Sequence, residues 1–310
     1  MRIAQFIDTM NQGGAEHVVL DLAQALGIEG HEVVVLHFGS PYLKQQCRLL
    51  GLTERVVPGH RFYKKTATLP QFAWLFQQYL RHEGIQVLHS HLFGPITGAA
   101  PAARMAGIPH IGTLHDVYSI TDKPPRIRLL QLASLLGTRL VAVSHDMEQF
   151  YRSRARFSPQ ALRTVYNGVA FPSVRGDRQQ LRQNLGLPPH APVIITVGRL
   201  VSLKRQSLLF EAFGQLDDRL EGHFLVVGDG PERERLERMR RTLPQGERIH
   251  LLGTRSDVAS LLKAADIFCL GSDTEGLSCS VLEAMAAGLP AVVTNVGGNR
   301  ELVHDDYNGF

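Results

Sequence analysis

Cysteine is scarce in this chain, which holds only Cys47, Cys269 and Cys279 among its 310 residues. An odd number of widely separated thiols argues against a disulfide framework and fits a reducing compartment. No spacing of Cys and His typical of a metal site stands out, so we expect no bound metal. A disulfide-stapled secreted domain is therefore not expected.

Long apolar runs are missing as well. No stretch of about 18 apolar residues occurs, so no membrane-spanning helix is expected. Residues 1–8 become polar too soon for a signal peptide. The glycines after the first apolar run do not form the G-x-G-x-x-G fingerprint, which argues against a plain NAD domain. These absences predict a cytoplasmic protein.

Negative charge is under-represented in the first half of the chain. Residues 1–170 carry 17 Lys and Arg against 11 Asp and Glu, whereas the remainder carries 16 against 18. A basic first half suggests an acidic acceptor or peripheral contact with the inner face of a membrane. A solvated surface with a mild excess of arginine is the simpler alternative. We expect no nucleic-acid partner.

Apolar strands and amphipathic helices alternate in two successive series. This pattern predicts an α/β protein with two Rossmann-like, doubly wound domains facing a cleft. We assign residues 1–172 to the first domain, 173–190 to a linker with one short helix, and 191–310 to the second domain. Because no closing helix follows the last strand at 290–294, the second domain is expected to be truncated at its C-terminus, with an uncovered sheet edge.

The most informative stretch follows the apolar run 265–270. Its loop carries Glu275, and the helix that follows carries Glu283 about two turns in. Open α/β sheets bind ligands at such strand ends, and amides near a helix start suit a phosphate. Two carboxylates there would grip the hydroxyls of a sugar attached to that phosphate. The alternatives are a helix cap for Glu275 and a surface residue for Glu283.

Two weaker features lie in the first half. Gly13 and Gly14 follow the first strand and would let the backbone approach a ligand, although an ordinary tight turn is the alternative. His89, His91 and His115 stand at strand ends that face the ligand crevice, although such histidines are often structural.

A basic and aromatic stretch precedes the predicted helix 69–80. The helix places Phe72, Leu75, Phe76 and Leu80 at helical spacing, which predicts a core face rather than a membrane-binding stripe. Four residues remain as candidates for acceptor contact: Arg61, Lys64, Lys65 and His91.

The order of these motifs resembles the family 4, or group 1, glycosyltransferases of the GT-B fold. The motifs that carry the resemblance are Gly13-Gly14-Ala15-Glu16, His89-Ser90-His91, Thr113-Leu114-His115-Asp116, Val143-Ser144, Tyr166-Asn167-Gly168-Val169, Val197-Gly198-Arg199-Leu200 with Lys204, Gly228-Asp229-Gly230-Pro231, Glu275-Gly276 with Glu283-Ala284-Met285-Ala286, Gly288-Leu289-Pro290 and Gly297-Gly298. The pair of Glu275 and Glu283 is the most specific part.

The resemblance implies a retaining, metal-independent enzyme without a cofactor. It would move a sugar from a nucleotide-diphosphate sugar to a glycan, lipid-linked or small-molecule acceptor. The roles implied are Glu275 on the donor sugar, Glu283 on the ribose, Arg199 and Lys204 on the diphosphate, His115 beside the sugar, and Gly13 and Gly14 against the phosphates or acceptor. Backbone amides of Gly276, Leu277 and Ser278 would add to the diphosphate site.

Physical chemistry supports these roles. Cleavage of a sugar–phosphate bond leaves negative charge on the diphosphate, which cations and amides must stabilise when no metal is bound. Arg199 offers a rigid fork and Lys204 a mobile point charge.

Two alternatives remain open. A sugar-nucleotide epimerase would share the donor site but use no acceptor. A nucleotide-sugar binding protein without turnover is the second alternative. In the family, a final helix crosses back to the first domain, so a protein ending at Phe310 is expected to transfer weakly or not at all.

Overall fold

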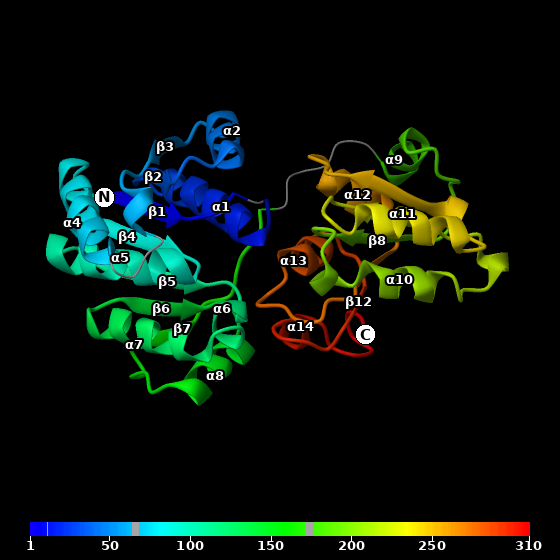
Figure 1. The fold of residues 1–310 in the computed structure, drawn as a ribbon. Helices are drawn as coiled ribbons and strands as arrows, with labels where there is room; N and C mark the ends of the chain where they lie inside the picture. The colour runs from blue at the N-terminus through cyan, green and yellow to red at the C-terminus, as the bar shows by residue number, and fades with distance from the viewer. Residues whose placement is uncertain (11, 64–67, 171–176) are drawn as a thin grey trace. The chain divides into compact units, whose positions relative to one another are not determined.

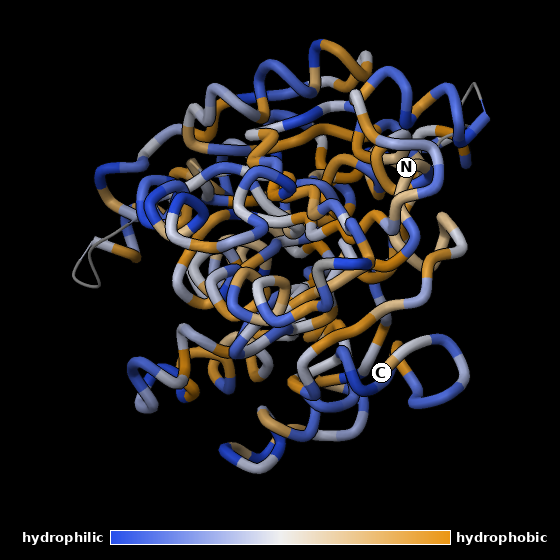
Figure 2. The backbone as a smooth tube through the Cα atoms, turned by 90° about the vertical axis from the view of Figure 1, so that its right-hand side faces the viewer, coloured by the Kyte–Doolittle hydropathy of each residue, from blue (hydrophilic) through white to orange (hydrophobic). Residues whose placement is uncertain are grey.

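The computed structural model describes residues 1–10, 12–63, 68–170 and 177–310, and it divides into unit 1, Met1–Asn167, and unit 2, Gly168–Phe310 (Figure 1). Each unit contains one parallel β-sheet flanked by helices. Hydrophobic and hydrophilic segments alternate along the chain (Figure 2). Two doubly wound α/β units are therefore confirmed.

Unit 1 is organised around a seven-stranded sheet in the order β3-β2-β1-β4-β5-β6-β7. The strands are β1 Arg2–Ile7, β2 Glu32–His37, β3 Thr53–Val56, β4 Val87–His91, β5 His110–Leu114, β6 Arg139–Ala142 and β7 Leu162–Thr164. Five of the six residues of β1 are buried, as expected for a strand covered on both faces. The order changes direction between β1 and β4, so this pair forms the switch point where such sheets bind ligands.

Helices cover this sheet. They are α1 Gly14–Ile28, α2 Pro41–Leu49, α3 His60–Tyr63, α4 Leu69–His82, α5 Phe93–Ala106, α6 Tyr118–Thr121, α7 Ile127–Leu135 and α8 His145–Arg154, with a 3₁₀ turn η2 at Pro124–Arg126. The predicted core face of α4 is confirmed for Phe72, Phe76 and Leu80, which have no exposed surface. The Phe76 ring lies 5.0 Å from that of Phe6 on β1, so α4 is fastened to the sheet.

Unit 2 repeats the pattern with five strands in the order β10-β9-β8-β11-β12. The strands are β8 Val193–Val197, β9 His223–Val227, β10 Ile249–Gly253, β11 Ile267–Leu270 and β12 Ala291–Val293. The helices are α9 Arg178–Asn184, α10 Gln206–Phe213, α11 Arg233–Thr242, α12 Val258–Ala264, α13 Cys279–Ala286 and α14 Asn299–Leu302, with 3₁₀ turns η3 Ser202–Lys204, η4 Asp218–Leu220 and η5 Gly246–Arg248. The switch point lies between β8 and β11.

A buried ion cluster fastens α9 to this sheet. Arg182 is 5% exposed, and its guanidinium donates to the carbonyl oxygens of Ala264, Pro189 and Ala191 and to Asp266. Asp266 also accepts from the backbone amide of Val193 at the start of β8. The short helix predicted in the linker 173–190 therefore packs on the sheet of unit 2.

The expectation of an uncovered sheet edge beside β12 is wrong. The Val293 amide donates to Phe310 O over 2.8 Å, and the Phe310 amide donates to Ala291 O over 2.9 Å. The Ala291 amide also donates to the carbonyl oxygen of Asn308. The last residues of the chain therefore pair with the backbone of β12 and satisfy its open groups.

Candidate functional site

Two loops meet at the switch point of unit 2. One follows β8 and carries Arg199 and Lys204, and the other follows β11 and carries Glu275. The Asp273 amide donates to Leu203 O over 2.9 Å, which joins the loops through their backbones. The structure therefore brings together Lys204 and Glu275, which are 71 residues apart in the sequence.

The Glu275 carboxylate is held by two donors on the same oxygen. Lys204 Nζ lies 2.5 Å from Glu275 Oε1, and Ser272 Oγ donates to Oε1 over 2.6 Å. The Glu275 side chain is 9% exposed. No described residue bonds to Oε2, so this oxygen remains available for a ligand hydroxyl. The helix-cap alternative for Glu275 is wrong, because Ser278 caps α13 with its own hydroxyl.

Gly297 lies so close to the loop that carries Glu275 that no side chain fits at position 297. Gly297 has a φ of +49°, and a Cβ there would lie 1.8 Å from Glu275 O. The Gly298 amide donates to Gly276 O over 3.1 Å. This pair of glycines after β12 therefore packs directly on the backbone that carries Glu275.

Arg199 stands at the end of β8 with an exposed side chain. Its guanidinium forms no hydrogen bond or ion pair with any described residue, whereas its carbonyl oxygen accepts from Gln206 Nε2 over 2.9 Å. A backbone fixed in this way with an uncommitted cation suits a binding site for an anion.

The helix after this loop begins at Cys279, so Glu283 lies about one turn into α13 and not two as predicted. The N-terminus of α13 adds partial positive charge at the same loop. Gly276, Leu277 and Ser278 are buried, and the Ser278 hydroxyl is used as the cap of α13. Glu283 itself is half-buried.

The switch point of unit 1 holds the other predicted residues. Gly13 is the N-cap of α1 and uses no side-chain cap, and Gly14 is the first residue of that helix. Leu92, directly after β4, has φ 72° and ψ 159°. This region costs a non-glycine residue about 1–3 kcal/mol and is concentrated at functional sites.

Histidines from β4 and from the end of β5 form a hydrogen-bonded cluster beside that strand end. His91 Nε2 lies 2.7 Å from Gln5 Oε1 on β1, and His91 Nδ1 lies 3.0 Å from His115 Nε2. His89 Nε2 lies 2.7 Å from Thr113 Oγ1. The rings of His91 and His115 stack at 5.3 Å.

Burial keeps these rings neutral. It lowers the pKa of His89 to about 4 and the pKa of His115 to about 3, and it holds the pKa of His91 well below 6.5. His110, which bonds Ser90 and Thr138 behind the cluster, has its pKa lowered to about 3 by the same cause.

Among the predicted acceptor contacts, His91 is wrong. Its ring has no exposed surface, and both ring nitrogens are bonded to protein groups. Arg61 on α3 is exposed, with its guanidinium 4.6 Å from the Phe62 ring. Lys64 and Lys65 lie outside the described residues.

Sequence reasoning missed two residues that hold the predicted ones. Ser272 orients Glu275, and Gln5 orients His91. Gln5 has no exposed surface and lies in the apolar strand β1. A polar residue in the middle of a buried strand is the signal that points to it.

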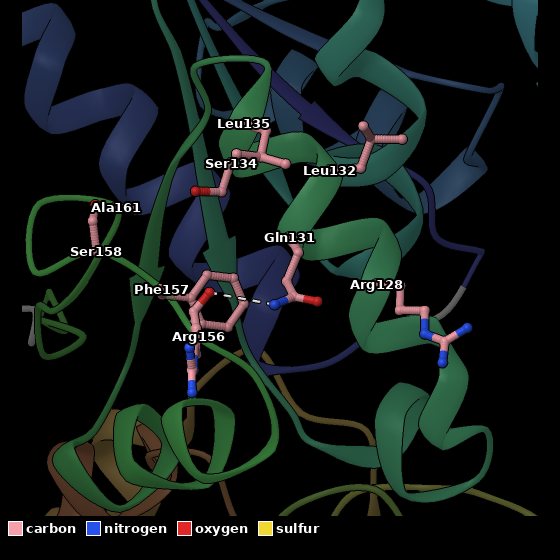
Figure 3. Close-up of a pocket in the computed structure, with 9 residues that line it drawn as sticks. All are labelled: Arg128, Gln131, Leu132, Ser134, Leu135, Arg156, Phe157, Ser158 and Ala161. Atoms are coloured by element: carbon pink, nitrogen blue, oxygen red, sulfur yellow. Dashed lines mark hydrogen bonds between the residues drawn. The ribbon is translucent and has the colours of Figure 1, made fainter.

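A groove of about 590 Å³ lies on another face of unit 1, between α7 and the connection from α8 to β7. Arg128 and Leu132 line it from α7, and Arg156 and Phe157 line it from the connection (Figure 3). Gln131 Nε2 donates to Arg156 O across it over 3.3 Å.

No described helix is both long and apolar enough to cross a membrane. In the described ranges, no group of three or more His, Cys, Asp or Glu residues is arranged to hold a metal ion.

Two family models match the chain along most of its length. The model described as "Glycosyltransferase Family 4" matches residues 12–171, and "Glycosyl transferases group 1" matches residues 177–310.

Curated relatives resemble the chain at moderate identity. The Escherichia coli UDP-Gal:alpha-D-GlcNAc-diphosphoundecaprenol alpha-1,3-galactosyltransferase is 30% identical over 246 residues, covering 74% of this chain and 63% of that protein. The Bacillus anthracis N-acetyl-alpha-D-glucosaminyl L-malate synthase is 26% identical over 305 residues, covering 96% and 80%. The Arabidopsis thaliana phosphatidylinositol N-acetylglucosaminyltransferase protein is 30% identical over 312 residues, covering 96% and 67%. The chain thus spans about two thirds of the length of the first and third relatives.

Solved structures share the fold. The Anabaena Alr3699/HepE structure in complex with UDP-glucose has a TM-score of 0.83 at 23% identity, covering 100% of this chain and 85% of that chain. WaaG, a glycosyltransferase involved in lipopolysaccharide biosynthesis, has a TM-score of 0.73 at 18% identity, with the same coverage.

Proposed function

Because this chain belongs to the group 1, family 4 glycosyltransferases, we propose that it transfers a sugar from a nucleotide-diphosphate sugar to an acceptor hydroxyl. The reaction breaks the bond between the anomeric carbon and the diphosphate and forms one to the acceptor oxygen. The proton of the acceptor hydroxyl leaves with the diphosphate. We further propose that the anomeric configuration is retained and that no metal ion takes part.

The observation that carries this proposal is the cluster of Lys204, Glu275 and Ser272 at the switch point of unit 2, with Arg199 on the same loop as Lys204. The departing diphosphate gains negative charge as the bond breaks. Arg199 is suited to bind two of its oxygens, and Lys204 adds a second positive charge. The partial positive charge at the start of α13 adds a third favourable interaction with the diphosphate.

Glu275 is suited to fix the sugar. With Oε1 bonded to Lys204 and Ser272, the carboxylate has one orientation, and Oε2 accepts from a sugar hydroxyl. A site built around such a directed bond discriminates strongly against sugars that lack the hydroxyl. Glu283, one turn into α13, is proposed to hold the ribose of the donor.

The names of the relatives support a choice of donor and acceptor classes to test. The E. coli relative is named for UDP-galactose, so a UDP-sugar is the first donor to test. The relatives are named for a diphosphoundecaprenol, L-malate and phosphatidylinositol, all of which are anionic. An anionic acceptor agrees with the 17 Lys and Arg against 11 Asp and Glu in residues 1–170.

A thermal-shift panel of UDP, GDP and ADP sugars tests the donor site. We expect the preferred donor to stabilise the wild type and to stabilise Glu275→Ala much less. Asp273→Asn is the matched control, because it changes an exposed carboxylate of the same loop that pairs with Arg205. Equal stabilisation of Glu275→Ala and wild type would show that Glu275 does not bind the donor.

Turnover assays test the reaction class. Incubation with the donor alone should leave the sugar nucleotide unchanged, whereas conversion to an epimer would make the protein an epimerase. With an acceptor present, NMR of the product should show the anomeric configuration of the donor. Activity should persist in EDTA, and its loss with recovery on adding a divalent cation would refute the metal-independent mechanism.

We also propose that α7 contacts an anionic membrane surface. Its leucines Leu129, Leu132 and Leu135 are 40%, 50% and 84% exposed. Residues 122–163 carry 8 Lys and Arg against 3 Asp and Glu, and Arg128 and Arg156 flank the groove beside α7. Exposed leucines between arginines suit shallow insertion among acidic lipid headgroups.

Co-sedimentation with phosphatidylglycerol vesicles tests this surface. The double variant Leu132→Glu, Leu135→Glu should bind at least about tenfold more weakly, because the leucines no longer leave water on binding. Leu49→Glu, Leu50→Glu changes two exposed leucines on and just after α2 and should bind as the wild type does. Equal binding of both variants, or equal binding of the wild type to phosphatidylcholine vesicles, would refute the proposal.

A further inference from the structure

Gln5, His91 and His115 form a continuous hydrogen-bonded row across three elements of unit 1. Gln5 lies on β1, His91 is the last residue of β4, and His115 follows β5. The two links are 2.7 Å from Gln5 Oε1 to His91 Nε2 and 3.0 Å from His91 Nδ1 to His115 Nε2. Gln5 and His91 have no exposed surface, whereas His115 is partly exposed.

The row has a direction, because a carbonyl oxygen can only accept. Gln5 Oε1 therefore requires the proton on His91 Nε2. A neutral His91 then has a bare Nδ1, which accepts from Nε2–H of His115. A neutral His115 in turn keeps its Nδ1 unprotonated, and no described residue bonds to that atom.

We propose that Gln5 and His91 are positioning residues that fix His115 as the tautomer protonated on Nε2, so that Nδ1 presents a lone pair to the substrate. In catalytic and metal-bound histidines, a group that is hydrogen-bonded to the second ring nitrogen sets the tautomer and the ring orientation in the same way. This inference rests on the proposed function and on the family resemblance, which implies that His115 lies beside the transferred sugar.

The chemistry of the row suits His115 to hydrogen bonding and not to proton abstraction. Burial lowers the pKa of His115 to about 3, which makes the ring too weak a base to hold a proton at neutral pH. A bare Nδ1 instead accepts a hydrogen bond from a hydroxyl of the donor sugar or acceptor. The opposite tautomer would offer an N–H there and would repel the hydroxyl proton.

The wild-type tautomers test the row directly. Two-bond ¹H–¹⁵N correlation NMR of histidine-labelled protein distinguishes Nδ1–H from Nε2–H rings without donor or turnover. We expect Nε2–H for both His91 and His115. Nδ1–H on both rings would mean that the Gln5 amide donates and that the row runs in reverse, which would overturn the proposal.

Gln5→Met removes the acceptor while keeping the length of the side chain. We expect the Nδ1–H tautomer of His115 to become populated and kcat to fall about tenfold, as when one net hydrogen bond is lost in the transition state. Thr113→Val is the matched control, because it removes the partner of His89 on the same strands but leaves the row intact. That control should keep both wild-type tautomers.

The two proposals fail separately. If the wild type transfers no sugar from any donor, the proposed function fails, while the tautomers still decide the row. If transfer occurs and Gln5→Met keeps the wild-type tautomer of His115 or the wild-type kcat, Gln5 is not a positioning residue. Unfolding of Gln5→Met would leave the wild-type tautomers as the deciding measurement.

Discussion

Acidification from pH 6.5 to pH 5 should destabilise unit 1, because it contains a cluster of buried neutral histidines. The pKa of His89 is lowered to about 4, and the pKa values of His110 and His115 are lowered to about 3. In the unfolded chain these rings titrate near pH 6.5. Below that pH the unfolded state therefore binds protons at these rings, whereas the folded state does not.

The sign and size follow from proton linkage. The stability contributed by a depressed pKa is present above the unfolded pKa and is lost as the pH falls towards the folded value. Between pH 6.5 and 5, each of the three rings costs between about 1 and 2 kcal/mol, or about 5 kcal/mol together. His91 acts in the same direction. This loss is comparable to the whole stability of an ordinary domain.

Urea unfolding at a series of pH values provides the assay. Trp74 on α4 is the only tryptophan in the chain, so its fluorescence reports unit 1 alone. His110→Asn should be less stable at pH 7 but should lose about 1 to 2 kcal/mol less stability between pH 6.5 and 5. Ser90→Ala removes a hydrogen bond to His110 but keeps the ring, so its pH dependence should match the wild type.

Two results would refute this reasoning. The first is a free energy of unfolding of unit 1 that stays constant between pH 6.5 and 5. The second is a pH dependence of His110→Asn that equals that of Ser90→Ala. Either result would mean that the folded protein accepts protons on these rings without unfolding.

Three further predictions concern unit 2. Gly297→Ala should abolish donor-induced thermal stabilisation, because a Cβ 1.8 Å from Glu275 O must displace that loop. Gly288→Ala is its control, because an added Cβ at that position has no heavy atom within 4 Å. Asp266→Asn should destabilise unit 2 by about 3 kcal/mol in calorimetry by leaving Arg182 buried without its partner, whereas Asp217→Asn on the surface should leave Tm unchanged. Arg199→Lys should weaken nucleoside diphosphate binding about tenfold in titration calorimetry, and unchanged affinity would refute the bidentate role.

Much of the fold could be predicted because the signals are local. Continuous apolar runs such as residues 33–36 of β2 are typical of buried parallel strands, and they mark the sheet. The position of the Glu275 loop after β11 followed from the rule that ligands bind at strand ends. The distance of Glu283 from the helix start was overestimated, because composition does not fix the first residue of a helix, which the Ser278 cap places at Cys279.

The roles of individual side chains were harder to predict. His91 looked like an acceptor contact because it ends a strand, but it points into the protein between Gln5 and His115. The sheet edge at β12 was expected to be uncovered because no closing helix follows that strand, whereas an irregular segment ending at Phe310 supplies the hydrogen bonds. Neither arrangement has a periodic signature in the sequence.

The sequence by itself thus determined two doubly wound units and the loops at their strand ends, because periodicity and turn residues act over short distances. Only the tertiary structure decided which side chains meet. Lys204 and Glu275 are 71 positions apart, and Gln5 and His91 are 86 positions apart. Such pairs depend on strand order and register, which are set by the packing of the whole sheet and not by any local pattern.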